Sequence, residues 1–453
     1  MTESGRALLE HVWRTLGRDH GELSLVERAP HPVPLPARTD VAGLSWASVT
    51  AASLTAARLA GAARVRCDPE AIAISYASER HFRLDGERPD AFAPLSGFFR
   101  TADGWVRTHG NYPHHAEALR RALGVSADAG RDRVEAALAA TSAVGAASAI
   151  TKAGGLCVVV APEDPAADSA LRRTPLIDTR MLRGGPAHPF TFDPRAPLRG
   201  IRVLDLTRVI AGPVATRTLA LWGADVLRVD PPTLPEIGWQ HLDSGHGKRT
   251  AVVDARSDTF AELLAAADVV VLGYRPRALD DLGLAPERLA ADAGPGGIVV
   301  GRLSAWGSDS GADRRGFDSL VQAASGIAWI ESADTSTPGA LPAQALDHSA
   351  GYLLAAGITS ALARRAHEGG SWLVETSLRR IAAQLLGMPR TARPEPAASH
   401  ADPGAHLQTF AVAASEVTTT APAVAYDGAP GRYAAPRTWG SDSPEWLPRE
   451  RTI

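Results

Sequence analysis

The chain has 453 residues, a formal net charge of -3, 45% hydrophobic and 21% charged residues, and two cysteines. This length allows two or three domains, and the near-neutral charge predicts neither a nucleic-acid partner nor an anionic membrane partner. Two cysteines exclude a disulfide framework and favour a reducing, cytoplasmic compartment, and the sequence shows no signal peptide and no apolar run of about 18 residues that would span a membrane.

The first part of the chain predicts helices followed by a small α+β domain. Residues 1–80 are helical in pattern and rich in alanine, with a Pro-rich segment at 31–40. Residues 81–182 contain a predicted hairpin, FFRTADGWVRTH, with a turn at Ala102-Asp103-Gly104, and then helices and a strand. The Gly/Pro-rich stretch 183–198 is predicted to link this domain to the next.

Residues 199–390 predict the large domain. Residues 198–231 have the pattern of a buried strand, a small-residue turn, a helix and a second strand, which is one βαβ unit. Strands and helices then alternate to about residue 390, which favours a parallel sheet. The expected fold class is α/β, with a Rossmann-like large domain and a small α+β domain. Residues 391–453 are predicted to be an extended tail with one strand near 417–426.

Two alanine-rich stretches, 43–78 and 345–387, are weakly similar to each other in sequence. In that overlay Ser45 falls where Asp347 stands, although two unrelated helices would give a similar pattern. Asp347 opens a predicted apolar helix, where free N–H groups and the helix dipole favour an ionised carboxylate. From the residues alone, Asp347 is either a plain N-cap or a functional group.

Five ordered motifs resemble the class III CoA-transferases, the family that includes carnitine and formyl-CoA transferases and α-methylacyl-CoA racemase. They are RVLDLTRVIAGPVATRTLALWGADVLRVDPP, GKRTAVVDARSD, ADVVVLGYRPRALDDLGL, GFDSLVQAASG and ALDHSAGYLLAAGI. The earlier stretch FFRTADGWVRTHGNYPHHAEALRRALG resembles the small domain of that family, which ordinarily follows the large domain. The chain therefore resembles two degenerate family units in tandem, which together contain about one complete set of the family's structural elements.

The resemblance implies transfer of CoA between an acyl-CoA and a carboxylic acid. Asp347 matches the nucleophilic aspartate of the family, which forms a mixed anhydride and then an aspartyl-CoA thioester. CoA would be a substrate, with no further cofactor. A homodimer is expected, with each site shared between a large and a small domain.

The resemblance also implies which residues contact CoA. Small residues after the first strand would let the backbone approach the ligand, and arginines at strand ends would bind its phosphates. The expected CoA contacts are Val209, Ile210, Ala211, Arg249, Val253, Arg256, Gly273, Tyr274, Arg275, Gly316 and Phe317.

The residues present argue against a dinucleotide-binding site and against a metal site. A dinucleotide loop needs G-x-G-x-x-G, and here the turn holds only Gly212. No metal is expected, because His114 and His115 read as surface residues without a cysteine or acid to complete a ligand set.

Two alternatives to CoA transfer stay open. One is an acyl-CoA racemase or isomerase, although Phe317 stands where the racemases place a histidine base. The other is a catalytically inactive CoA-binding protein, because Gly273 replaces the usual asparagine of the family and Asp281 replaces an arginine found in some members.

Overall fold

A seven-stranded sheet lies at the centre of the computed structural model, which describes residues 2–190, 192–308, 311–392, 394 and 403–449. The strand order is β5-β11-β10-β9-β6-β7-β8, and every neighbouring pair is parallel except β5 with β11. The predicted α/β class is confirmed, and the apolar runs fit it because helices cover both faces of a parallel sheet. The strands are β5 (Asp178–Arg183), β6 (Arg202–Leu206), β7 (Asp225–Asp230), β8 (Arg249–Val252), β9 (Val269–Leu272), β10 (Val299–Ser304) and β11 (Ser371–Ser377).

The strand order reverses between β6 and β9. From β6 the chain continues outward through β7 and β8, and it then returns to β9 on the other side of β6. In open α/β sheets, ligands bind at such a point, beyond the carboxyl ends of the strands. Residues 207–211 and 273–275 follow β6 and β9, so both segments begin at the edge where a ligand site is expected.

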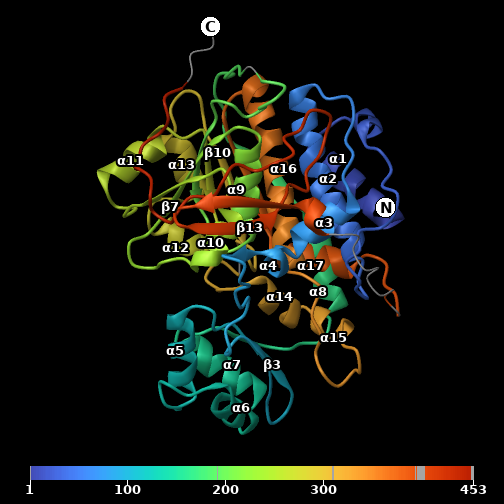
Figure 1. Cartoon of the computed structure of the whole chain (residues 1–453), viewed down its shortest axis with the longest axis vertical. Coiled ribbons are helices and arrows are strands. Elements are labelled where there is room, and N and C mark those ends of the chain that lie inside the picture. Colours follow the sequence, from blue (N-terminus) through green and yellow to red (C-terminus); the bar gives the residue numbers. More distant parts are fainter. Residues whose placement is uncertain (1, 191, 309–310, 393, 395–402, 450–453) are drawn as a thin grey trace.

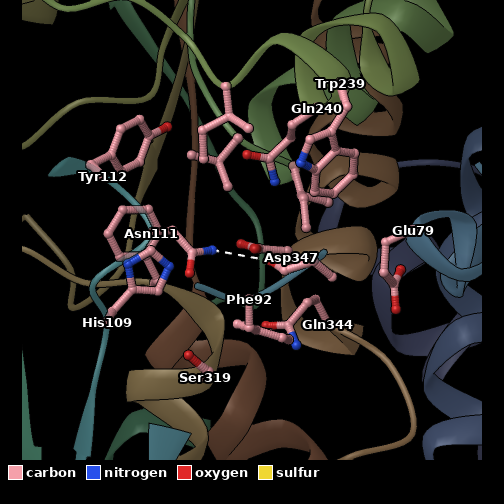
Figure 2. A pocket seen from close by; sticks show the side chains of 15 residues that line it. Glu79, Phe92, His109, Asn111, Tyr112, Trp239, Gln240, Ser319, Gln344 and Asp347 are labelled. Atoms are coloured by element: carbon pink, nitrogen blue, oxygen red, sulfur yellow. Dashed lines mark hydrogen bonds between the residues drawn. The ribbon is translucent and has the colours of Figure 1, made fainter. Parts of the chain in front are cut away.

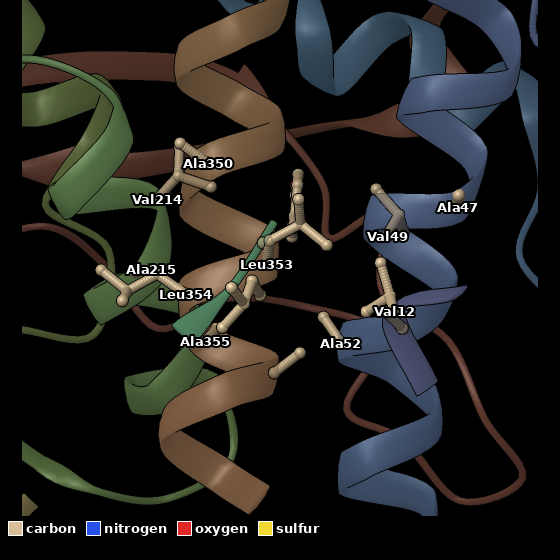
Figure 3. Close-up of a cluster of buried hydrophobic side chains, with 14 of the residues drawn as sticks. Val12, Ala47, Val49, Ala52, Val214, Ala215, Ala350, Leu353, Leu354 and Ala355 are labelled. Atoms are coloured by element: carbon tan, nitrogen blue, oxygen red, sulfur yellow. The ribbon is translucent and has the colours of Figure 1, made fainter. Parts of the chain in front are cut away.

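Helix α16 (Ala345–Glu368) is the central helix of the large body and is buried along most of its length. Helix α2 (Val41–Ala60) packs along one side of it and α9 (Ala211–Leu221) along another (Figure 3). One continuous apolar core joins these helices to α1 (Glu3–Thr15) and to the sheet. The N-terminal segment therefore shares the core of the large domain. Its helix α2, which is weakly similar in sequence to α16, lies beside that helix.

A glycine is required where α16 crosses α9. A Cβ atom at Gly351 would lie 2.5 Å from the carbonyl oxygen of Ala211 and 2.7 Å from Cβ of Val214, closer than the two helices could accommodate. The missing side chain therefore allows the first turns of α16 to lie against the segment that follows β6. This approach brings Asp347 beside residues 209–211.

The remaining helices of the large body surround the sheet and α16 (Figure 1). Several begin with a side-chain cap, as in α11, where Ser257 Oγ accepts a hydrogen bond from the Phe260 N–H. Their bounds are η1 (His20–Leu25), α3 (Pro69–Tyr76), α4 (Ser78–His81), α8 (Pro165–Arg172), α10 (Gly238–Ser244), α11 (Asp258–Ala265), α12 (Pro276–Asp280), α13 (Pro286–Asp292), α14 (Asp318–Ala324), α15 (Ile327–Ile330) and α17 (Leu378–Leu386).

A smaller lobe projects from one end of the large body (Figure 1). Its sheet has the order β2-β3-β4, and its own core includes Phe99, Val106 and Leu119. The predicted hairpin is confirmed, because β2 and β3 pair in an antiparallel register around residues 101–104. The elements of this small lobe are β2 (Gly97–Arg100), β3 (Trp105–Thr108), α5 (Pro113–Ala122), α6 (Arg131–Ala139), α7 (Ala143–Lys152) and β4 (Cys157–Val159).

Two segments differ from the predicted organisation. Strand β5 falls within the predicted small domain 81–182, but it pairs with β11 in the large sheet. The predicted tail 391–453, of which residues 393, 395–402 and 450–453 lie outside the described residues, forms two strands where one was predicted. After η2 (Pro403–His406), β12 (Leu407–Val412) pairs with β13 (Ser415–Thr420), which also pairs with β1 (Arg83–Leu84). These pairings join segments far apart in the chain, so a local pattern does not reveal them.

Candidate active site

Asp347 lies in the first turn of α16, and the helix begins earlier than predicted. The N-cap residue is Gln344, which makes no side-chain cap, so the interpretation of Asp347 as the N-cap is wrong. Instead, Asp318 on α14 caps the helix from outside, because its Oδ2 accepts a hydrogen bond of 2.9 Å from the Asp347 N–H. Among the described residues, no hydrogen bond reaches the carboxylate of Asp347, which is therefore free to face a ligand.

Asp347 and Asp318 form a buried pair of carboxyl groups. Asp347 is 7% exposed and Asp318 is fully buried, and the second oxygen of Asp318 accepts a hydrogen bond from the Gln322 amide. Burial raises the pKa of Asp318 to about 6. Burial, followed by the charge of Asp318, raises the pKa of Asp347 well above its usual range. Burial and the neighbouring Asp318 therefore act against the helix start, which would favour the ionised form of Asp347.

Replacing Asp347 by asparagine is expected to raise the melting temperature at pH 8 and to change it little at pH 4. A carboxyl group whose pKa is raised by folding stabilises the native state below its unfolded pKa, and this contribution is lost as the pH rises through the folded value. The amide that replaces the carboxyl group carries no charge at any pH. Thermal unfolding at both pH values measures the difference, with Asp254→Asn on the surface as the control. An equal effect at the two pH values would contradict the raised pKa.

Two cavities meet at Asp347. The larger, called here the outer cavity, has a volume of about 270 Å³ and lies at the ends of β6, β9 and β10. The smaller, called the inner cavity, has a volume of about 40 Å³ and is drawn in Figure 2. Both are lined by Tyr112, Val209, Ile210, Phe317 and Asp347. A ligand that fills both cavities would therefore pass the carboxylate of Asp347.

Most of the residues predicted to form the site line the outer cavity. They come from the segments after β6 and β9, from the segment before α14 and from the start of α16, which the sheet topology brings to one edge. Those that line it are Val209, Ile210, Ala211, Gly273, Tyr274, Arg275, Gly316, Phe317 and Asp347.

The structure explains why a glycine occupies position 273. A Cβ atom at this position would lie 3.0 Å from Cβ of Thr207, because the segments after β9 and β6 pass close to each other. A larger residue would push these segments apart. The glycine therefore allows both segments to line the same cavity.

Three predicted contacts lie away from both cavities. Arg249 forms a bidentate ion pair with Asp225, in which Nε donates to Oδ1 at 3.0 Å and Nη2 donates to Oδ2 at 3.0 Å, and Arg249 is 9% exposed. Val253 is buried in the core on the other face of the sheet from α16. Arg256 is exposed at the surface, 3.9 Å from Asp254. The structure therefore gives Arg249 and Val253 structural roles and leaves Arg256 in solvent.

The small lobe supplies aromatic and histidine side chains that sequence reasoning missed. His109 stacks on Phe317, with ring centroids 3.9 Å apart and an angle of 4° between the rings. His109 also lines the inner cavity, and burial lowers its pKa to about 3, so its imidazole is neutral. His115, predicted as a surface residue, is 6% exposed, whereas His114 is exposed as predicted, and both line the outer cavity. No local signal in the sequence connects these residues to Asp347.

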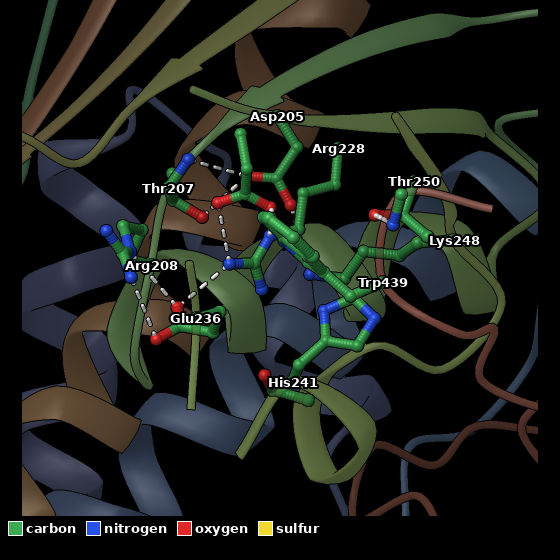
Figure 4. Close-up of polar contacts among 12 residues, drawn as sticks. Asp205, Thr207, Arg208, Arg228, Glu236, His241, Lys248, Thr250 and Trp439 are labelled. Atoms are coloured by element: carbon green, nitrogen blue, oxygen red, sulfur yellow. Dashed lines mark hydrogen bonds and ion pairs between the residues drawn. The ribbon is translucent and has the colours of Figure 1, made fainter. Parts of the chain in front are cut away.

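A buried ionic network in the large body, part of which is drawn in Figure 4, also contacts the small lobe. The Tyr112 hydroxyl donates a hydrogen bond of 2.6 Å to Glu236. Arg228 donates to Glu236 at 2.8 Å and to Asp230 at 2.7 Å, and Arg208 donates to Glu236 at 3.3 Å. Glu236 is therefore the common acceptor that fixes the position of Tyr112 at the wall of both cavities.

The same carboxylate supports a strained residue of the site. Val209 has a φ of 71°, which is unfavourable for a β-branched side chain, and its N–H donates to Glu236 at 3.4 Å. Burial alone would raise the pKa of Glu236, but the charges of Arg228 and Arg208 hold it at about 2. Glu236 is therefore ionised, and it stabilises the backbone conformation that directs residues 209–211 toward the cavity.

Three arginines line the outer cavity: Arg208, Arg275 and Arg315. Arg208 is engaged by Glu236, whereas Arg275 and Arg315 donate only to backbone carbonyls, at 3.4 and 3.0 Å. Neither of the latter two forms an ion pair within the described part of the chain. Both are therefore available to an anionic ligand group.

No cluster of three or more histidine, cysteine or acidic side chains among the described residues has the geometry of a metal site. None of the helices described combines the length and the apolar character needed to cross a bilayer.

The comparison with protein families identifies one match. The model of CoA-transferase family III matches residues 198–427, just over half of the chain. This range contains β6 to β11, the pair of carboxyl groups and most of the residues that line the outer cavity. It does not contain the small lobe.

Curated relatives match the same part of the chain. A probable fatty acyl-CoA transferase of Mycobacterium tuberculosis is 30% identical over 213 residues, which is 43% of this chain and 54% of the relative. A formyl-CoA:oxalate CoA-transferase of Bradyrhizobium sp. (strain ORS 278) is 30% identical over 188 residues, 38% of this chain and 44% of the relative. The chain thus spans about half the length of the curated relatives it matches.

Solved structures also match part of the chain. A hypothetical protein of Mycobacterium tuberculosis has a TM-score of 0.38 at 29% identity, and the match covers 42% of this chain and 56% of the other. A CAIB/BAIF family protein of Brucella suis has a TM-score of 0.38 at 24% identity, covering 49% of this chain and 65% of the other.

Proposed function

The chain belongs to CoA-transferase family III, and from this premise we propose that it moves CoA from an acyl-CoA to a carboxylic acid, with Asp347 as the nucleophile. The observation that carries the proposal is the position of Asp347, whose free carboxylate lies where the outer and inner cavities meet. The outer cavity offers room and cations for CoA, and the inner cavity offers room for an acyl group. Relatives described as CoA-transferases support the same chemistry.

The proposed reaction uses the carboxylate of Asp347 twice. One oxygen attacks the thioester carbon of the acyl-CoA, the C–S bond breaks, and the CoA thiolate leaves a mixed anhydride. The thiolate then attacks the side-chain carbonyl of Asp347, which releases the donor carboxylate and forms an aspartyl-CoA thioester. An incoming carboxylate attacks the carbonyl carbon of that thioester, the C–S bond breaks, and the CoA thiolate leaves a second mixed anhydride. The thiolate finally attacks the acceptor's acyl carbon, which forms the product thioester and restores Asp347.

Intact-protein mass spectrometry tests this proposal. The protein is incubated with a panel of acyl-CoAs and then treated with hydroxylamine, which cleaves thioesters and anhydrides. We expect a hydroxylamine-sensitive adduct with the mass of CoA on the peptide that contains Asp347. Binding of CoA without an adduct across the whole panel would contradict CoA transfer and favour a catalytically inactive CoA-binding protein.

Replacing Arg275 by alanine is expected to raise KM for an acyl-CoA by about tenfold, because a guanidinium–phosphate hydrogen bond is lost. With the matching acyl-pantetheine, which has no diphosphate, the variant and the wild type should have equal KM values. Steady-state kinetics with both substrates measures this. Arg256→Ala is the matched control, since Arg256 lies outside both cavities and should leave both KM values unchanged. An equal rise with acyl-pantetheine would contradict a phosphate contact.

Racemisation at the α-carbon is the second candidate function, and the position of His109 bears on it. Phe317 stands where racemases of the family have a histidine, but His109 stacks on Phe317 and lines the inner cavity with Asp347. Burial lowers the pKa of His109 to about 3, which makes it a weak base for a carbon-bound proton. CoA transfer is therefore preferred, and exchange of the α-proton with deuterated solvent distinguishes the two reactions.

Quaternary structure and location stay predictions. A homodimer and a cytoplasmic location are expected, with CoA as substrate and no further cofactor. The outer and inner cavities are lined by small-lobe residues such as Tyr112 and by large-body residues such as Asp347, and the small lobe precedes most of the large sheet in sequence. We therefore propose that one chain holds both the large-domain and the small-domain parts of its site.

A further inference from the structure

A third cavity adjoins the inner cavity. This distal cavity has a volume of about 270 Å³ and shares Glu79, Phe92, Ser319 and Gln344 with the inner cavity. It shares no lining residue with the outer cavity. The inner cavity therefore lies between the other two, and an acyl group that starts at Asp347 can extend past these four residues into the distal cavity.

Arg107 on β3 lines the distal cavity, and within the described residues its side chain has neither a hydrogen-bond partner nor an ion-pair partner. Its guanidinium carbon lies 4.8 Å from the ring centroid of Phe98 and 5.4 Å from that of Phe92. Its Nε is buried without a hydrogen-bond partner, and no ion pair or hydrogen bond reaches its guanidinium group within the described residues. Stacking on aromatic rings uses the faces of a guanidinium and leaves its N–H edge free.

Glu79 and Arg80 are the other charged residues that line the distal cavity, and Arg80 Nε lies 3.6 Å from Glu79 Oε1. The buried carboxyl group of Asp318 also attracts the charge of Arg107, but no ion pair joins these two among the described residues. Burial lowers the pKa of Arg107 to about 10, which still leaves it protonated at neutral pH. A largely buried cation without a partner is unfavourable, and an anionic ligand would remove that cost.

We propose that Arg107 binds a second carboxylate at the far end of the acyl group, so that the substrate is a dicarboxylic acid or its CoA monothioester. This inference rests on the proposed CoA transfer at Asp347. A carboxylate accepts two parallel hydrogen bonds from the edge of a guanidinium, which explains the choice of arginine here. The inner cavity, at about 40 Å³, holds about three water molecules by the usual measure of ~10–15 Å³ each. An unbranched chain of a few methylene groups fits this passage.

Matched pairs of acyl-CoAs test the proposal. Glutaryl-, adipyl- and pimelyl-CoA are compared with valeryl-, hexanoyl- and heptanoyl-CoA, which have the same chain lengths but no terminal carboxylate. For at least one pair, kcat/KM of the wild type should favour the dicarboxylic member by about tenfold or more. In Arg107→Met this preference should fall to about one, while the unsubstituted member should be used as well as before. Arg107→Lys should restore part of the preference.

Arg100→Met is the matched control. Arg100 lies on the neighbouring strand β2 and also stacks on an aromatic ring, with its guanidinium carbon 5.7 Å from the ring centroid of Trp105, but it lines neither the inner nor the distal cavity. The variant should keep the wild-type preference. Two results would overturn the role of Arg107. One is an equal loss of kcat/KM for both members of each pair in Arg107→Met, and the other is a wild type whose kcat/KM does not favour the dicarboxylic member of any pair.

Binding to a variant that cannot react separates this inference from the proposed function. In Asp347→Asn, calorimetry should show a lower Kd for adipyl-CoA than for hexanoyl-CoA, and the added Arg107→Met substitution should remove the difference. If the wild type shows no transfer but this difference is present, the proposed transfer is wrong and the carboxylate site stands. If transfer occurs and the difference is absent, the carboxylate site is wrong.

Discussion

Replacing Asp347 by alanine is expected to abolish the CoA adduct and to lower kcat for CoA transfer by at least about 10,000-fold. Removal of a covalent nucleophile has the largest effect of any single substitution in an active site, on the order of a millionfold in a serine protease. The carboxylate of Asp347 lies where the outer and inner cavities meet, and no described side chain competes for it. Intact-protein mass spectrometry and steady-state kinetics measure the two effects.

Two controls separate lost chemistry from lost structure. Asp254→Ala removes an exposed carboxylate outside the cavities and should leave both adduct and kcat unchanged. The melting temperature of Asp347→Ala should be no lower than that of the wild type, because the substitution removes a buried carboxyl group that resists ionisation. An adduct that persists in Asp347→Ala would contradict the role of Asp347 as the nucleophile.

Replacing Glu236 by alanine is expected to destabilise the protein by about 3–5 kcal/mol, because it leaves buried arginines without their common partner. The side chains of Glu236 and Arg228 are each 1% exposed, and that of Arg208 is 11% exposed. For a domain of this size the melting temperature should fall on the order of 10 °C. Thermal unfolding at pH 7 measures the change. Because the pKa of Glu236 is depressed to about 2, its contribution is full above its unfolded value and is lost as the pH falls from there through about 2.

Two milder variants calibrate the effect of Glu236. Tyr112→Phe removes one hydrogen bond to Glu236 and should cost about 1 kcal/mol. Glu262→Ala changes an exposed acid on α11 and should stay within about 0.5 kcal/mol of the wild type. If Glu236→Ala and Glu262→Ala have the same melting temperature, the ionic network around Glu236 does not stabilise the protein.

The parts of the site that could be predicted from the sequence lie on local motifs. Val209 to Ala211 follow an apolar strand, and Gly273 to Arg275 follow another, so the general rule for parallel sheets places both at one edge. Asp347 falls in the first turn of a long apolar helix. Each of these placements depends on a pattern within about ten neighbouring residues, and the structure brings all of them to the outer cavity.

The remaining parts depend on contacts between distant segments. Arg249 follows the predicted pattern of a phosphate contact, yet it donates three hydrogen bonds to Asp225. His109 and Arg107 belong to a hairpin more than 200 residues before Asp347, and nothing in that hairpin indicates which cavity it will line.

The sequence by itself determined the α/β class, the hairpin of the small lobe and the position of Asp347 at a helix start, because apolar periodicity and turn residues act over short distances. Only the tertiary structure decided the surroundings that raise the pKa of Asp347, namely burial and Asp318 from another helix. It also decided that Arg107 lies at the distal cavity with no hydrogen-bond or ion-pair partner among the described residues. Electrostatic free energies depend on everything that surrounds a charge, and those surroundings exist only once the chain has folded.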